Sequence, residues 1–216
     1  MAKIANWSDD YWLLLLQAYL QKPEGVKPIY SKVLVDLGME LHIHPAKLHA
    51  KMEEIATRPT PLLQRLWDNY DGNTRRLQKA VRQLHKMKGF GCGDLFYNGV
   101  TVKETFEKDF RPIEADNRIM PVTLILILNL YFQLTPATMV AATPEVIDLA
   151  RLVKLKPIDI ETILVVFQHC DPYLNRQDPM ISPFFGPCKD VWQRFSTESP
   201  ESLETLASEL SDYFKS

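Results

Sequence analysis

The chain has 216 residues, 46% of them hydrophobic, which excludes intrinsic disorder and allows one large domain or two small ones with a buried core. Its formal net charge of −2 excludes a general electrostatic attraction to nucleic acid or to an acidic membrane, so such binding would need a local concentration of charge. The three cysteines, Cys92, Cys170 and Cys188, are an odd number without close pairing, which excludes a disulfide framework and favours a cytoplasmic protein.

Five helices are predicted in residues 1–88, which we expect to form a first helical domain. Their starts follow from capping residues and prolines, because a Ser or Thr side chain accepts a hydrogen bond at a helix N-terminus and proline tolerates the first helical position. The starting residues, in chain order, are Ser8, Ser31, Pro45, Thr60 and Thr74. The segment from Lys22 to Tyr30 contains two prolines and a glycine and predicts a loop.

The second and third of these helices are predicted to form a hinged pair around residues 42–45. Apolar residues recur at three- and four-residue spacing along one face of each helix, and Ile43 is the single apolar residue of the turn between them. The expected inward positions are Leu34, Leu37, Leu41, Leu48, Met52 and Ile55. This pattern predicts a helix-turn-helix, an arrangement used by many DNA-binding proteins.

Residues 89–118 differ in character and predict a linker or irregular insert. They contain four glycines, an Asn98-Gly99 turn signal and several acidic residues. A short hairpin is expected from Leu95 to Thr101.

Residues 119–216 predict a second helical domain, so the expected fold class is all-α. Its most apolar stretch, Pro121 to Thr135, is too short to cross a bilayer and predicts a core helix, with no membrane association. The remaining helices are expected over residues 143–154, over 157–169, through Trp192 and Phe195, and over 199–214. Residues 171–187, with Asp-Pro, Ser-Pro and Gly-Pro steps, predict a long ordered loop.

The two domains show signs of an internal repeat. The segment Tyr11–Pro61 aligns with Thr123–Tyr173 without a gap. Seven identities over that length exceed chance only modestly, but the capping, turn and apolar positions also coincide, as when Ile43 aligns with Leu155. We therefore predict two helix-turn-helix-like units joined by a basic helix and the irregular linker.

Three short segments, LNLYF (128–132), TPEVIDLARLV (143–153) and VVFQHCDPY (165–173), carry a family resemblance. They resemble the N-terminal segment that precedes the nuclease domain in HNH-type restriction endonucleases, where it is assigned to DNA binding. The resemblance implies DNA binding and not nuclease activity, because His169 is the only histidine in the second half of the chain. Taken whole, the chain resembles an uncharacterised bacterial family of tandem helix-turn-helix proteins, which implies no activity.

Positive charge concentrates in the first domain. Residues 42–88 contain ten Lys and Arg against four Asp and Glu, whereas residues 89–150 contain four against eight. On the helix after the first turn, Lys47, His49 and Lys51 are the candidate contacts, because the start of a recognition helix faces the base edges. The alternative is a solvated helix surface. The corresponding helix of the second unit is expected to expose Asp159, Glu161 and Thr162, which indicates a structural or partner-facing copy.

The helix from Thr74 to Lys88 has the densest charge. Arg75, Lys79, Arg82 and Lys86 fall on one stripe opposite an apolar face, and Arg76 lies beside them. Such a stripe can follow a phosphate backbone, although a basic helix surface without function is the alternative.

The sequence predicts no catalytic, cofactor or metal site. The histidines near the first turn have no Cys or carboxylate at a recognised ligand spacing, and Cys92 has no activating base beside it. The leading hypothesis is therefore a non-enzymatic, DNA-binding regulatory protein. The alternative is a protein–protein interaction or self-association module, with the acidic second unit and the loop from Pro172 to Pro187 as its contact surface.

Overall fold

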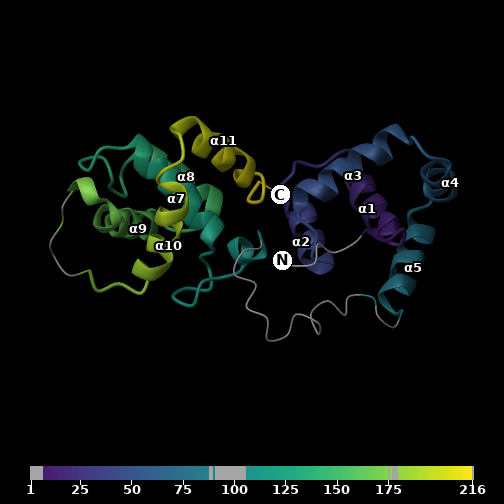
Figure 1. Cartoon of the computed structure of the whole chain (residues 1–216), viewed down its shortest axis with the longest axis horizontal. Helices are drawn as coiled ribbons and strands as arrows, with labels where there is room; N and C mark the ends of the chain where they lie inside the picture. The colour runs from purple at the N-terminus through teal and green to yellow at the C-terminus, as the bar shows by residue number, and fades with distance from the viewer. Residues whose placement is uncertain (1–6, 88–89, 91–105, 175, 177–179, 216) are drawn as a thin grey trace. The chain divides into compact units, whose positions relative to one another are not determined.

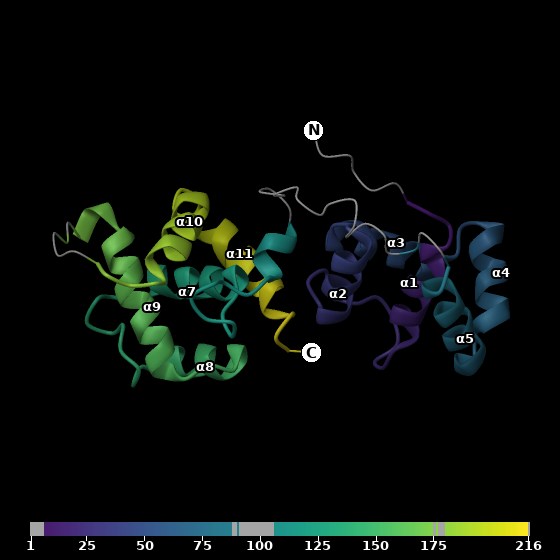
Figure 2. The same ribbon diagram turned by 90° about the horizontal axis from the view of Figure 1, so that it is seen from below.

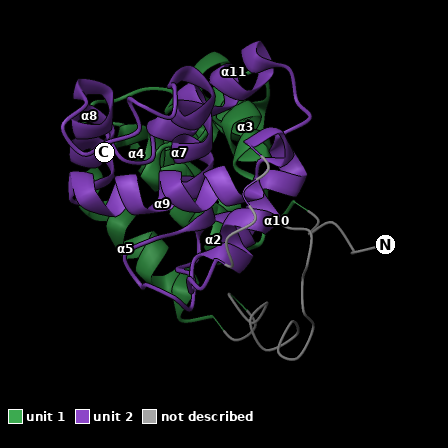
Figure 3. Cartoon of the chain, turned by 90° about the vertical axis from the view of Figure 1, so that its left-hand side faces the viewer, with its two compact units in different colours: residues 1–103 green, residues 104–216 purple. Residues whose placement is uncertain are grey.

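The computed structural model describes residues 7–87, 90, 106–174, 176 and 180–215. Contacts divide the chain into two compact units, residues 1–103 and 104–216, which Figure 3 colours separately. In the described residues every regular element is helical, and the only bridge is an isolated pair between Ile113 and Asp116. The all-α prediction is confirmed.

Five helices build the described part of the first unit (Figure 1). They are α1 (Tyr11–Leu20), α2 (Lys32–Leu41), α3 (Pro45–Thr57), α4 (Pro61–Tyr70) and α5 (Thr74–His85). Helix α1 is central, because α3 and α5 both pack against it and it lies between them in both ribbon views (Figures 1 and 2). Its Leu15 and Leu16 are almost completely buried.

The hinge between α2 and α3 positions both apolar faces toward α1. His42 ends α2 in the left-handed conformation, with φ of 55°, and the amide of Ile43 donates to the carbonyl of Gly38 at 3.0 Å. This is the reversal that closes many helix C-termini. All the inward positions predicted for this pair, including Ile43, are buried, each with at most 8% of its surface exposed. The prediction of these core residues is confirmed.

Two predicted caps in this unit are at the wrong residue, and Ser31, although it is the N-cap residue of α2, makes no capping hydrogen bond with its side chain among the described residues. Helix α5 is capped by Asn73, whose side-chain oxygen accepts from the amide of Arg76 at 3.1 Å, so Thr74 is the first helical residue. Helix α1 begins at Tyr11, and the Ser8 hydroxyl only accepts a 3.4 Å contact from the amide of Asp10. Several polar residues precede each of these helices, and spacing alone does not distinguish which of them reaches the free amides at the helix start.

The described part of the second unit surrounds α7 (Pro121–Gln133). Against α7 pack the short 3-10 helix η1 (Phe106–Phe110) and the helices α8 (Pro144–Val153), α9 (Pro157–Cys170), α10 (Phe185–Phe195) and α11 (Pro200–Ser211). A second 3-10 turn, η2 (Pro172–Leu174), follows α9. Because neighbours lie on every side, nearly all of α7 is buried, and its prediction as a core helix is confirmed. Nowhere in the described ranges is a helix both long and apolar enough to cross a membrane.

Part of the predicted linker packs onto this second unit. Phe110 is buried against Tyr213, and the guanidinium of Arg194 in α10 binds the carboxylate of Asp109 in η1. Residues 106–118 thus contribute to the fold of residues 104–216. The predicted hairpin from Leu95 to Thr101 and Cys92 lie outside the described residues.

Candidate nucleic-acid interface

Helix α5 separates apolar from basic side chains. Leu77, Val81 and Leu84 are buried, and α5 packs against α1. Three basic residues on the other side of the helix, and Lys86 at its C-cap, are all exposed. These four residues, Arg75, Lys79, Arg82 and Lys86, are called the α5 stripe from here on. Burial of the apolar face therefore orients the stripe toward solvent.

The α5 stripe is a linear array of available charge. Within the described residues, none of its four side chains forms an ion pair or a side-chain hydrogen bond. From Arg75 to Lys86 it spans eleven residues, about 16 Å at about 1.5 Å per helical residue. Phosphates of one DNA strand recur about every 3.4 Å along the duplex axis, so the stripe matches the axial rise of about five phosphates.

Arg76, the fifth predicted residue of this helix, has partners within the first unit. Its guanidinium donates to the carbonyl of Asn69 at 3.3 Å and lies 5.5 Å from the centre of the Tyr70 ring. Both contacts reach back to α4. Arg76 therefore holds the turn between α4 and α5, although its side chain remains exposed.

The three predicted residues of α3 are less available than those of α5. Lys51 forms a 2.6 Å ion pair with Glu54, and its ammonium lies 5.3 Å from the Trp12 ring and 5.6 Å from the Trp7 ring. Lys47 and His49 are half-buried. Helices α3 and α5 each pack against α1, and α1 lies between them in both ribbon views.

Cations packed on aromatic rings were missed by the sequence analysis. Besides Lys51, Arg58 at the end of α3 places its guanidinium 4.3 Å from the centre of the Trp67 ring. Such contacts favour the folded state and hold the cation at the surface of the unit. The Lys51–Glu54 spacing was a visible signal for an ion pair, but the ring contacts come from residues distant in the chain.

The acidic residues of α9 do not project freely, contrary to the prediction. Asp159 accepts from the amide of Lys156 at 3.1 Å and lies 3.6 Å from the guanidinium of Arg118. Glu161 accepts from the amide of Ala141 at 2.6 Å. Both are half-buried because they satisfy backbone amides of their own unit, whereas Thr162 is exposed as predicted.

The described residues contain no cluster of three His, Cys, Asp or Glu side chains that could hold a metal ion. Cys170 and Cys188 are free thiols, and burial raises the pKa of Cys170 to about 11 and that of Cys188 still further. Both thiols therefore stay protonated near neutral pH, which disfavours nucleophilic chemistry.

Comparisons with family models, curated proteins and solved structures found no significant match to this chain.

Proposed function

We propose that this is a non-enzymatic DNA-binding protein that holds the phosphate backbone along the α5 stripe. One observation carries the proposal: four exposed cations lie on one helix face, with no acidic partner among the described residues. An unpaired cation releases counterions from DNA when it contacts a phosphate, whereas a paired one must first lose its own partner. Phosphate contacts carry no sequence information, so binding through the phosphates alone implies little sequence preference.

The charge distribution supports the same proposal. Residues 1–103 contain 15 Lys and Arg against 10 Asp and Glu, a net charge of +5, and residues 104–216 contain 10 against 17, a net charge of −7. A polyanion is therefore attracted to the first unit and repelled by the second. Lys47 and His49 are secondary contacts in this proposal, and Lys51 and Arg76 act mainly within the fold.

We further propose that α1–α3 and α7–α9 are two copies of one helix-turn-helix-like unit. In the gap-free alignment of the two segments, the ends of α8 coincide with the ends of α2, and Pro157 at the start of α9 coincides with Pro45 at the start of α3. Lys154 repeats the left-handed conformation of His42, and the amide of Leu155 donates to Ala150 at 2.9 Å as Ile43 donates to Gly38. Three residues form each turn, as in helix-turn-helix motifs. Aligned homologous sequences in which both segments share one profile would support the duplication.

A regulatory role without catalysis and a cytoplasmic location complete the proposal. The free thiols of Cys170 and Cys188 suit a reducing compartment. The alternative, a protein–protein interaction or self-association module, is favoured by the segment after α9, where Tyr173 and Ile181 are almost fully exposed.

The test is the salt dependence of DNA binding. A variant in which all four residues of the α5 stripe become glutamine is compared with a control that loses four exposed cations elsewhere: Lys32→Gln, Arg151→Gln, Lys154→Gln and Lys189→Gln. Fluorescence anisotropy with a labelled 20-base-pair duplex measures affinity between about 50 and 200 mM salt. The slope of log affinity against log salt falls by about 0.9 per lost phosphate contact, so the stripe variant should lose about 3 to 4 units of slope.

The control should keep most of the slope, because its cations are dispersed. Circular dichroism checks that both variants stay helical. Equal losses in the two variants, or an unchanged slope in the stripe variant, would overturn the proposal.

A further inference from the structure

Helices α4 and α5 form a second tight helix pair in the first unit. Only Asp71, Gly72 and Asn73 separate them, and Gly72 has a φ of 68°, in the left-handed region that favours glycine. The two helices pack on each other and lie together at one edge of the unit (Figures 1 and 2). A short turn with a glycine is typical of a helix-turn-helix, whose second helix can enter the major groove of DNA.

Hydrogen bonds on both sides hold this turn. The amide of Asp71 donates to the carbonyl of Trp67 at 2.8 Å, and the side chain of Asn73 caps α5 by accepting from the amide of Arg76. The guanidinium of Arg76 in turn reaches back to the carbonyl of Asn69. The direction of α5 relative to α4 is therefore fixed before any ligand binds, which lowers the cost of binding.

Helix α5 exposes enough of its surface to enter a groove. Of its twelve residues only Leu77, Val81 and Leu84 are buried. The major groove of DNA is about 12 Å wide and admits a helix of about 10–12 Å in diameter. In α3, the helix expected from the sequence to read DNA, Lys47 and His49 are half-buried. The structure therefore favours α5 over α3 as the recognition helix.

Gln78 lies beside the α5 stripe in the N-terminal half of the helix. It follows Arg75 by three residues and precedes Arg82 by four, so both are its neighbours on the helix surface. Its side chain is exposed and has no hydrogen bond within the described part of the chain. At about 100° per residue, Gln78 points about 70° around the helix axis from the centre of the stripe. When the stripe contacts the phosphates of one strand, Gln78 can thus face the base edges.

We propose that α5 reads base edges in the major groove of duplex DNA and that Gln78 selects an adenine. A glutamine amide offers one donor side and one acceptor, which match N7 and the N6 amino group of adenine. The inference rests on the proposed DNA binding and adds the sequence preference that phosphate contacts do not supply.

Gln83 provides a matched control on the same helix. It is exposed like Gln78, but it lies on the other side of the stripe, next to Lys79 and Lys86, and nearer the C-terminus of α5. The N-terminal residues of a recognition helix are the ones that contact base edges, so the preference is assigned to Gln78.

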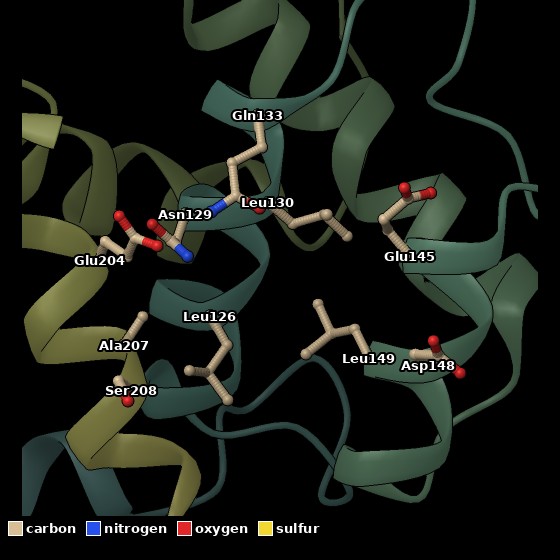
Figure 4. Close-up of a pocket in the computed structure, with 10 residues that line it drawn as sticks. All are labelled: Leu126, Asn129, Leu130, Gln133, Glu145, Asp148, Leu149, Glu204, Ala207 and Ser208. Carbon is tan, nitrogen blue, oxygen red and sulfur yellow. The ribbon is translucent and has the colours of Figure 1, made fainter. Parts of the chain in front are cut away.

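The open volume in the second unit is unsuited to DNA. It measures about 370 Å³, and the carboxylates of Glu145 and Asp148 on α8 and of Glu204 on α11 line it (Figure 4). Carboxylates repel phosphates, and residues 104–216 have a net charge of −7. Base reading is therefore assigned to the first unit.

The test selects DNA sequences with the full chain. A pool of duplexes with random central base pairs is mixed with the protein, and the bound fraction is sequenced. The unchanged chain should enrich adenine at one position by about fivefold or more, as a bidentate base contact does. Gln78→Ala should remove this preference, whereas Gln83→Ala should keep it.

A change of the preferred base is a sharper readout. Arginine pairs with N7 and O6 of guanine, so Gln78→Arg should move the preference at that position from adenine to guanine. Gln83→Arg adds the same charge and should strengthen binding without changing the preferred base. Circular dichroism checks that all four variants stay helical.

Failure of this inference is distinguishable from failure of the proposed function. Gln78→Ala removes no charge, so it should change the salt slope on an arbitrary duplex by less than about 0.5. A slope that depends on the stripe, without base preference in the unchanged chain, would overturn base reading and leave phosphate binding in place. A preference that survives Gln78→Ala, or that Gln83→Ala abolishes, would do the same. A slope that does not depend on the stripe would overturn both.

Duplex RNA separates groove reading from recognition of a phosphate array. The major groove of A-form RNA is too deep and narrow for side chains to read, so an RNA duplex of the selected sequence should compete at least about fivefold more weakly than the DNA. Equal competition by the two duplexes would overturn the assignment to the major groove of DNA.

Discussion

The ion pair between Asp109 and Arg194 should stabilise the second unit far more than an ordinary surface pair. The two guanidinium nitrogens donate to the two carboxylate oxygens, each at 2.7 Å, and the side chains are only 16% and 36% exposed. The hydrogen bonds to Asp109 raise the pKa of Arg194 above its ordinary value. The pair connects η1 to α10 across 85 positions of sequence.

Its magnitude follows from distance and burial. Unit charges about 4 Å apart interact by about 1 kcal/mol in water and about 4 kcal/mol at an effective dielectric constant of about 20. Desolvation offsets part of this gain, so we expect a coupling free energy of about 1–2 kcal/mol. The pair between Arg151 and Asp148 lies within one helix and is 75% and 71% exposed, so its expected coupling is only about 0.3 kcal/mol.

Double-mutant cycles measure both couplings. One cycle combines Asp109→Asn with Arg194→Gln, and the other combines Asp148→Asn with Arg151→Gln. The weaker 3.9 Å contact of Arg194 with Asp190 does not enter the measured coupling, because the single variant Arg194→Gln and the double variant both lose it.

Unfolding of the second unit can be followed through Trp192 alone. It is the only tryptophan in residues 104–216, so labelling with 5-fluorotryptophan gives one fluorine signal for that unit in a urea titration. Couplings of about 0.5 kcal/mol or less are within the range found for residues that do not interact. A coupling this small for Asp109–Arg194, or one no larger than that of Asp148–Arg151, would refute the expectation that partial burial and paired hydrogen bonds make this ion pair strong.

Two further predictions concern helix ends. His44 caps α3, because its Nδ1 accepts a hydrogen bond from the amide of Ala46, and burial lowers the pKa of its imidazole. Such a cap contributes about 1 kcal/mol to folding stability. This contribution is present above the unfolded pKa of about 6.5 and is lost as the pH falls through the lower pKa of the folded state. His44→Asn, which keeps an acceptor that does not titrate, should remove that part of the pH dependence in thermal unfolding between pH 7.5 and 5.5, and an unchanged profile would contradict the cap. Lys154 has a φ of 59°, so its substitution by glycine relieves about 1–2 kcal/mol of left-handed backbone strain. Glycine also increases the entropy of the unfolded chain, which costs about 0.5–1 kcal/mol of stability. Urea unfolding of Lys154→Gly should therefore show a gain of about 0.5–1 kcal/mol, and a loss of stability would contradict this balance.

The helices of this protein were predictable because their signals are local. Apolar spacing around Ile43 and prolines such as Pro45 and Pro157 act within one or two turns, and they located the helix starts and the buried faces correctly. The amphipathic pattern of α5 likewise placed its basic stripe on the exposed side. The caps were misplaced by two residues at Ser8 and by one residue at Thr74, where several polar residues precede the same free amides.

The sequence by itself determined the all-helical class, the hinge of each helix pair and the amphipathic basic helix, since each depends on residues a few positions apart. Only the tertiary structure decided which charges are available. Lys51 packs on Trp7 and Trp12, and Glu161 binds the amide of Ala141, twenty residues away. The physical reason is that helix formation needs neighbours along the chain, whereas the pairing or exposure of a charge depends on which distant groups folding brings within a few ångströms of it.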